Sequence, residues 1–394
     1  MGTQKVAQIG LDVHRKFSLA SLRDDRGQVV ARQRLAHADR NELRRGISRW
    51  PAGTPVVLEG TFGWGWMSDE LLALRMQPHL ASSRKVAGWR QSRGLAKSNR
   101  VDADLLGELW NEKPTMKHGM MERWWEVWLA PPEVRDQREL LRQRMGLVQM
   151  QTMVKNRIHA LLHRHGIVNQ LSDLFGVAGR RFLSLLVADP QLRQTGQQTL
   201  QDQLALLDTL RRLIARATRQ FRATMRRSEV GRRLMTLPGV SSVLAYTIMA
   251  EIGCIERFAT SRRLLRYSLL APQADDSGEE RPGKPIGRKI GHAGRTTLQW
   301  AWIEAAHGAV RKDAGLRDVF NRRTNHGKED RNRGYITVAN HLCRIAYAMW
   351  KKQTDYQAVP PRRNGNRRDR GNLSRPGTGQ PYHPMATGVG VIST

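Results

Sequence analysis

Three carboxylates stand next to predicted secondary-structure elements in the first hundred or so residues. Asp12 ends the apolar run 9–12, Ile-Gly-Leu-Asp, and Glu59 ends a second apolar run, residues 56–59. Asp102 opens a predicted helix. Phosphodiester cleavage uses Mg²⁺ to stabilise charge on the phosphate, and Mg²⁺ prefers carboxylate oxygens held on rigid elements. Each acid alone is more often a solvated residue at a strand end, but acids on two neighbouring strands favour a metal site.

The surrounding pattern predicts a mixed sheet that would bring these acids together. Residues 6–11, 17–22 and 28–32 read as strands, with a turn at 24–27; Asp39 is a helix N-cap, and the helix runs to about Trp50. Residues 54–58 form a buried strand, 67–76 a helix, 77–80 a fifth strand, and a helix follows Asp102. This βββαβαβα order is that of the α/β ribonuclease-H or RuvC-like fold, in which the strands that end in Asp12 and Glu59 are neighbours.

The charge of the chain indicates a polyanionic partner. There are 66 Lys and Arg against 35 Asp and Glu, a net charge of +31. The residues from Gln357 onward account for only +5, so the body itself carries +26. Lys and Arg in such excess displace counterions from phosphate backbones, which favours nucleic acid as the partner.

Cysteine usage and apolar runs bear on the compartment. Cys254 and Cys343 are too few and too far apart for a zinc site or a disulfide framework, and they suit a reducing cytosol. No signal-peptide core and no apolar run long enough for a membrane span are present, so we expect a protein of the bacterial cytosol or nucleoid.

Beyond Glu133 the pattern becomes helical. Apolar residues recur at intervals of seven, which is typical of a coiled coil: Leu140, Leu147, Val154 and Leu161, with Leu141, Val148 and Leu162 beside them. The face outside this stripe carries basic residues: Arg138, Arg142, Arg144, Lys155, Arg157 and Arg164. A second helix, about 200–235, holds nine Arg between positions 211 and 233. A solvated helical hairpin and a hairpin that binds a nucleic-acid strand or dimerises both remain open.

The C-terminal part combines helices with a polar loop. Residues 237–253 resemble a helix-hairpin-helix element, whose helix N-terminus presents N–H groups to phosphate; an ordinary helix start looks similar. Residues 272–288 form a Gly- and Pro-rich loop, 295–310 and 335–351 are helices, and 358–394 have the composition of a disordered tail. We therefore expect four segments: a RuvC-like catalytic domain at 1–130, a helical coiled-coil region at 131–230, a transposase-type domain at 231–353 and a basic tail at 354–394.

Short motifs along nearly the whole chain resemble the DEDD transposases of the insertion-sequence-110 family, including its 1111 branch. The first group comprises Ile-Gly-Leu-Asp at 9–12, Leu-Glu-Gly-Thr at 58–61 and Lys-Ser-Asn-Arg-Val-Asp-Ala at 97–103. The second comprises Leu-Pro-Gly-Val at 237–240, Arg-Phe at 257–258, Ala-Pro at 271–272, Ser-Gly at 277–278 and Ile-Gly-His-Ala-Gly at 290–294. The resemblance implies a RuvC-like domain with an Asp-Glu-Asp-Asp set and Mg²⁺, a coiled coil, and a second domain with a nucleophilic serine. It also implies a structured bridge RNA that pairs with donor and target DNA, and a homodimer or homotetramer.

Carried over residue by residue, this resemblance assigns a candidate site and two departures from the family pattern. Asp12, Glu59 and Asp102 match the first, second and fourth acids, Asn99 stands at the third, and Ser277 matches the nucleophile. An amide oxygen can still bind Mg²⁺ but brings no charge. Asp104, two residues beyond Asp102, would point about 160° away on a helix and does not replace it. Downstream, residues 291–292 read Gly-His where family members carry Ser or Thr before Lys.

The resulting hypothesis is an RNA-guided recombinase that cuts and rejoins DNA through a phosphoserine intermediate. Two rivals remain: a RuvC-like hydrolytic junction nuclease, and a decayed copy that binds nucleic acid without catalysis. Tryptophans 64, 66, 124, 125 and 128 could stack on bases but more often lie in a core or a domain interface, so they are left out of the site.

Overall fold

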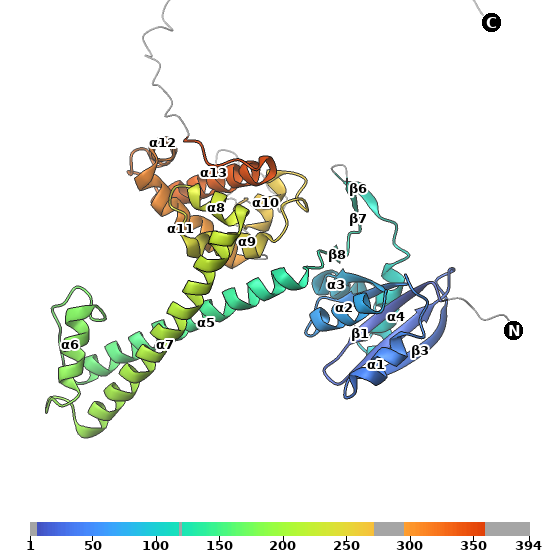
Figure 1. The fold of residues 1–394 in the computed structure, drawn as a ribbon, viewed down its shortest axis with the longest axis horizontal. Helices are drawn as coiled ribbons and strands as arrows, with labels where there is room; N and C mark the ends of the chain where they lie inside the picture. The colour runs from blue at the N-terminus through green and yellow to red at the C-terminus, as the bar shows by residue number, and fades with distance from the viewer. Residues whose placement is uncertain (1–5, 118–119, 272–294, 359–394) are drawn as a thin grey trace, which may run out of the picture.

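The computed structural model describes residues 6–117, 120–271 and 295–358 of the chain. Figure 1 shows an N-terminal part built on a sheet, a long helical hairpin that projects away from it, and a C-terminal group of helices beside the base of the hairpin. Ser277, the 291–292 pair, the 272–288 loop and residues 359–394 of the predicted tail lie outside the described residues.

The N-terminal sheet is mixed, as predicted. Its strands are β1 (Gln8–Val13), β2 (Phe17–Arg23), β3 (Val29–Ala36), β4 (Pro55–Glu59), β5 (Gln77–Ala81) and β8 (Glu126–Val127), in the spatial order β3-β2-β1-β4-β5-β8. Strands β3, β2 and β1 are antiparallel, β1, β4 and β5 are parallel, and β8 adds an antiparallel edge. The five longer strands were predicted; the two-residue β8 was not.

Local sequence signals determine the β2–β3 turn and the start of the first helix. The Asp24 carboxylate accepts hydrogen bonds from the backbone N–H groups of Arg26 and Gln28, and Gly27 takes a positive φ of 77°, which closes the β2–β3 hairpin. Asp39 caps α1 (Arg40–Ile47) by accepting from Asn41 N, as predicted, but the helix ends at Ile47 rather than near Trp50.

Three more helices and a small hairpin complete the N-terminal part. They are α2 (Trp64–Ala73), α3 (Ser83–Ser92), α4 (Asn99–Leu109) and the two-stranded pair β6 (Thr115–Lys117) and β7 (Met120–Glu122). Helix α3 and the β6–β7 pair were not predicted. Asp102 does not open α4: the helix begins at Asn99, because Ser98 caps it by accepting from Val101 N, and Asp102 lies in its first turn.

The hairpin pairs α5 (Pro132–Arg164) with α7 (Gln194–Arg227), and α6 (Val177–Leu186) lies at its tip (Figure 1). Leu141, Val154 and Leu161 from the predicted stripe are buried. The second helix was expected at 200–235, but Ser228 ends α7 and caps a separate helix, α8 (Glu229–Thr236), by accepting from Gly231 N.

Arg138 does not lie on an outer basic face, contrary to the sequence prediction. It is buried, and its guanidinium donates to the carbonyl oxygens of Ala250 and Glu251 at the C-terminal end of α9 (Ser242–Ile252), both at 2.9 Å. These carbonyls lack partners within their own helix, so Arg138 stabilises the helix end. The base of the hairpin is thereby fixed to the C-terminal helices.

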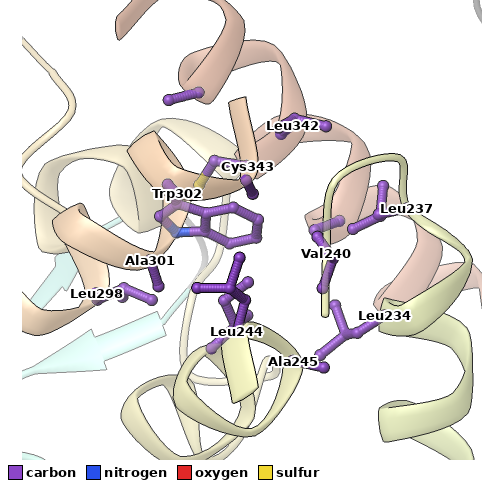
Figure 2. Packing of buried hydrophobic residues seen from close by; sticks show 14 of the residues in the cluster. Leu234, Leu237, Val240, Leu244, Ala245, Leu298, Ala301, Trp302, Leu342 and Cys343 are labelled. Carbon is purple, nitrogen blue, oxygen red and sulfur yellow. The ribbon is translucent and has the colours of Figure 1, made fainter. Parts of the chain in front are cut away.

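The C-terminal group consists of α8, α9, α10 (Ser261–Tyr267), α11 (Thr296–Lys312), α12 (Ala314–Arg323) and α13 (Arg331–Lys352). Figure 2 shows its core, in which the buried Trp302 of α11 lies among Leu244, Leu342 and Cys343. Gly239, in the turn between α8 and α9, has a φ of 82° and packs against Gly308 of α11, where a side chain would collide with backbone. No helix in the part of the chain that the structure describes is long and apolar enough to cross a membrane.

Candidate acidic site

Asp12 and Glu59 lie side by side because their strands pair in parallel. Leu11 of β1 is the register partner of Leu58 of β4, and each acid is the next residue along its strand. Neighbouring strands lie about 4.8 Å apart, and residues in register point to the same face. The sheet therefore places the two carboxylates next to each other, as the sequence predicts.

Helix α4 brings Asp102 to the same place through a glycine on β1. A Cβ added at Gly10 would lie 2.1 Å from the carbonyl oxygen of Ala103, so only glycine allows α4 to approach β1 this closely. Gly10 and Asp12 share a face of the strand, since side chains alternate. Asp102 precedes Ala103, and its charge acts on both Asp12 and Glu59.

Asn99 and Asp104 occupy different sides of α4. Asn99 is exposed at the first turn, on the side of the helix where the chain enters from Lys97 and Ser98. Asp104 instead accepts hydrogen bonds from Ser21 of β2, at 2.6 Å, and from Arg32 of β3. Burial alone would raise the pKa of Asp104, but these hydrogen bonds hold that pKa below its usual value. Asp104 is a structural ion-pair residue and lies away from the other acids.

The environment of the site disfavours its negative charges. Burial raises the pKa of Asp12, and the charge of Asp102 raises it further, while His14 and Lys97 act in the opposite direction. Burial also raises the pKa of Glu59, with Asp102 and Asp12 adding to the rise and a hydrogen bond from Ser83 opposing it. Carboxylates packed together at this cost are typical of sites that receive a cation.

Two partners of the acids were not predicted from the sequence. Arg90 of α3 donates to Asp102 at 2.7 Å. His14 Nε2 lies 2.8 Å from Asp12 Oδ2, yet both atoms are buried and neither makes a well-directed hydrogen bond. The position of His14, two residues past Asp12, was the only available signal for the contact between these two residues, and no sequence signal locates Arg90.

The donor set fits Mg²⁺ in its chemistry, since it offers three carboxylates and an amide oxygen. Buried Asp12 Oδ2, with no hydrogen-bond donor of its own, is the observation that favours a cation there. As the side chains stand, no group of three or more His, Cys, Asp or Glu among the described residues is close enough to hold a metal ion. Asp102 is held by Arg90, so binding a cation at all three acids requires its side chain to exchange that partner.

Comparison with known proteins shows that this chain is similar to transposases. The model of the transposase IS116/IS110/IS902 family matches residues 231–321, which include most of the C-terminal helices. The transposase for insertion sequence element IS1111A of Coxiella burnetii is 23% identical over 363 residues, covering 89% of this chain and 91% of that protein. A probable family 20 transposase of Pseudomonas aeruginosa is 24% identical over 358 residues, covering 89% of this chain and 99% of that protein. Over most of its length, the chain is thus similar to transposases of the IS110 family.

This transposase carries much of its exposed positive charge on the hairpin. Seven of the nine arginines between positions 211 and 233 are exposed, six of them on α7 and the last on α8: Arg212, Arg216, Arg219, Arg222, Arg226, Arg227 and Arg232. On α5, Arg142, Arg157 and Arg164 are exposed as well, whereas Arg144 donates to Thr218 of α7 at 3.0 Å. The predicted basic hairpin therefore keeps most of its charge in solvent, although Arg138 and Arg144 serve packing.

The remaining candidates of the transposase fall on packing contacts or outside the described residues. Trp125 is fully buried, and Trp128 packs on Gly253 and beneath the guanidinium of Arg257, which confirms that these two belong to the interior and a contact between parts. Ser241 caps α9, and phosphate binding at that turn stays a prediction. Ser277 lies in the segment between Ala271 and Arg295 that the structure does not describe.

Proposed function

We propose that this transposase cuts and rejoins DNA through a phosphoserine intermediate at Ser277, guided by a structured RNA. The acidic site of Asp12, Glu59, Asp102 and Asn99 would hold the Mg²⁺ that assists it. The observation that supports this proposal most is the convergence of Asp12 and Glu59 in one register, with Asp102 brought over them by Gly10. The strand order β3-β2-β1-β4-β5 supports a RuvC-like catalytic domain over residues 1–130.

The proposed reaction consists of two transesterifications. Ser277 Oγ attacks the scissile phosphorus, one P–O bond to the sugar breaks, and the proton of the serine passes overall to the leaving sugar oxygen. The hydroxyl of the other DNA then attacks the phosphoserine, which restores the Ser277 hydroxyl and forms the new phosphodiester. Bound Mg²⁺ supplies charge stabilisation at the phosphate. Asp12, Glu59 and Asp102 would position the metal ion. Lys97, within electrostatic reach of Asp12 and Glu59, partly offsets the negative charge of these two acids.

The net charge of the chain supports a guide RNA, and the length of helix α5 supports an oligomer. A body with a net charge of +26 carries more positive charge than contact with one duplex requires, and its exposed arginines extend along the hairpin. Helix α5, of 33 residues, is about 50 Å long at 1.5 Å per residue. Such an arm suits a homodimer or homotetramer that spans two duplexes. We further propose that residues 131–230 act as the coiled-coil region and 231–353 as the second catalytic domain.

One assay separates this proposal from its rivals. Protein expressed with its own flanking DNA is incubated with the RNA that it retains, two DNA sites and Mg²⁺, and the products are resolved under denaturing conditions. The proposal expects a covalent protein–DNA adduct that is absent from Ser277→Ala and retained by Ser184→Ala, an exposed serine of α6. Nicked DNA without an adduct would indicate a hydrolytic nuclease. Binding with neither product would indicate a non-catalytic copy.

A further inference from the structure

Phe62 exposes its ring to a degree that packing does not explain. Its residue is 89% exposed, and the only other exposed large aromatic among the described residues is Trp300, at 40%. A phenylalanine side chain in water forgoes the favourable free energy that its burial would provide. The neighbouring aromatic residues Trp64 and Trp66 are partly buried against the core, so Phe62 alone in this segment is left uncovered.

The backbone that carries Phe62 is anchored next to the acidic residues at both ends. Phe62 is three residues after Glu59, so its Cα lies within about 11 Å of that residue. Gly60 N donates to Ala81 O at 2.8 Å, which holds the start of the loop against β5. At the other end, Gly63 has a φ of 89°, and a Cβ there would lie 3.8 Å from Val13 Cγ1, next to Asp12. The loop therefore spans from one acid to the neighbour of the other.

Positive charge also lies within electrostatic reach of the acids. Residues 91–100, which run from the end of α3 into the start of α4, are all exposed, and Lys97 in this stretch acts electrostatically on both Asp12 and Glu59. An aromatic face together with basic residues along a strand path is the combination by which proteins hold single-stranded nucleic acid, with bases on the rings and phosphates on the cations.

We propose that Phe62 stacks on an unpaired base of the DNA strand whose phosphate enters the acidic site. The inference rests on the proposed function, because exchanging strands between two duplexes requires base pairs to open beside the cut. Stacking is indifferent to base identity, so Phe62 is a positioning residue: it holds the opened strand in place and takes no part in bond breaking.

Binding of a short single-stranded DNA that contains 2-aminopurine tests this role without cleavage. With full-length protein in EDTA, stacking on Phe62 should quench the fluorescence of the base. Phe62→Ala should abolish the quench and weaken binding roughly 5- to 150-fold, the range expected for one aromatic–base contact. Phe62→Trp should retain both. Leu185→Ala, which removes another exposed apolar side chain (68% exposed) on α6, should change neither.

Three outcomes would overturn the inference. They are an unchanged quench in Phe62→Ala, failure of Phe62→Trp to retain the quench, and equal loss with Leu185→Ala. Preference of Phe62 for an RNA strand of the same sequence over the DNA strand would overturn it too. Thermal unfolding should be the same for Phe62→Ala and wild type, since the ring makes little packing contact. The adduct assay distinguishes the two proposals: loss of the Phe62-dependent quench with a normal adduct defeats only this inference, and a missing wild-type adduct defeats the proposed function.

Discussion

Gly10 of β1 and Gly107 of α4 lie backbone against backbone. A Cβ on Gly10 would come within 2.2 Å of Gly107 N, and one on Gly107 within 3.4 Å of Gly10 N. Arg23 closes the other side of Gly107, since a Cβ there would also lie 2.7 Å from Arg23 Nε. The angle and depth at which α4 crosses the sheet, and with them the position of Asp102, depend on this pair.

Gly10→Ala should therefore destabilise the protein by about 3 kcal/mol, because the methyl group meets backbone atoms that cannot give way. It should also abolish cutting by displacing Asp102. Gly146→Ala is the matched control: Gly146 is in α5 with open space around it, so alanine there should stabilise by about 0.5–1 kcal/mol. Chemical denaturation of the three proteins measures both effects. Equal stability of Gly10→Ala and wild type would contradict the close approach.

Neutral substitutions at Asp12 and Asp104 should change stability in opposite directions. The pKa of Asp12 is raised on folding, so its ionisation costs stability once the pH exceeds its unfolded pKa, in full above its folded pKa. Asp12→Asn, in EDTA at neutral pH, should therefore raise the melting temperature by about 2–4 °C per kcal/mol of cost removed. The pKa of Asp104 is lowered, so its charge stabilises above the unfolded pKa, and Asp104→Asn should cost about 1–3 kcal/mol. A destabilised Asp12→Asn protein would show that the acid is structural.

Asn99→Asp should lower the Mg²⁺ concentration needed for half-maximal cleavage. The site would then carry four acids where the wild type has three and an amide, which increases its attraction for the cation. Asn99 is exposed at the N-terminus of α4, where a negative charge is favourable, so the substitution should leave folding intact. Titration of cleavage against Mg²⁺ measures the change, with Asp12→Asn as the inactive reference. If Asn99→Asp leaves the curve unmoved and Asp104→Ala abolishes activity, Asp104 is the third acid.

The hairpin arginines should carry much of the RNA binding. We expect protein that is expressed with its flanking DNA to copurify with a discrete RNA. Extraction of the protein should release this RNA, and ribonuclease should degrade it. Substituting Arg219, Arg222 and Arg226 together by Gln should reduce the slope of log binding constant against log salt by about 0.7–0.9 per lost phosphate contact. Arg45 of α1 and Arg49, two residues beyond the end of that helix, are both exposed and, substituted in the same way, serve as the control. Equal effects of the two sets would contradict a binding role specific to the hairpin.

The sequence predicted those parts of the structure whose causes are local. Apolar runs and apolar–polar alternation located the first five strands, and Asp39 and the 24–27 turn acted as their residue types suggest. Helix α3 was missed because only Val86 in it is buried, which leaves too little apolar periodicity to detect. Arg138 was misplaced because its partners, Ala250 and Glu251, are more than a hundred residues away. The glycine pair that positions Asp102, and the partners Arg90 and His14, likewise depend on packing between elements.

The direction in which the tip of the helical hairpin faces depends on the number of residues in each of its two helices. The tip carries uncovered apolar side chains, Val168, Val177 and Leu185, at the far end of two helices that pack along their length. Each residue of an α-helix turns the chain by about 100°, so removing two residues from each arm would swing these side chains roughly 200° about the hairpin axis. Removing seven from each would shorten the arm by about 10 Å and leave them within about 20° of their present bearing. The hairpin therefore tolerates changes of length in whole heptads, and other insertions or deletions rotate whatever surface its tip presents.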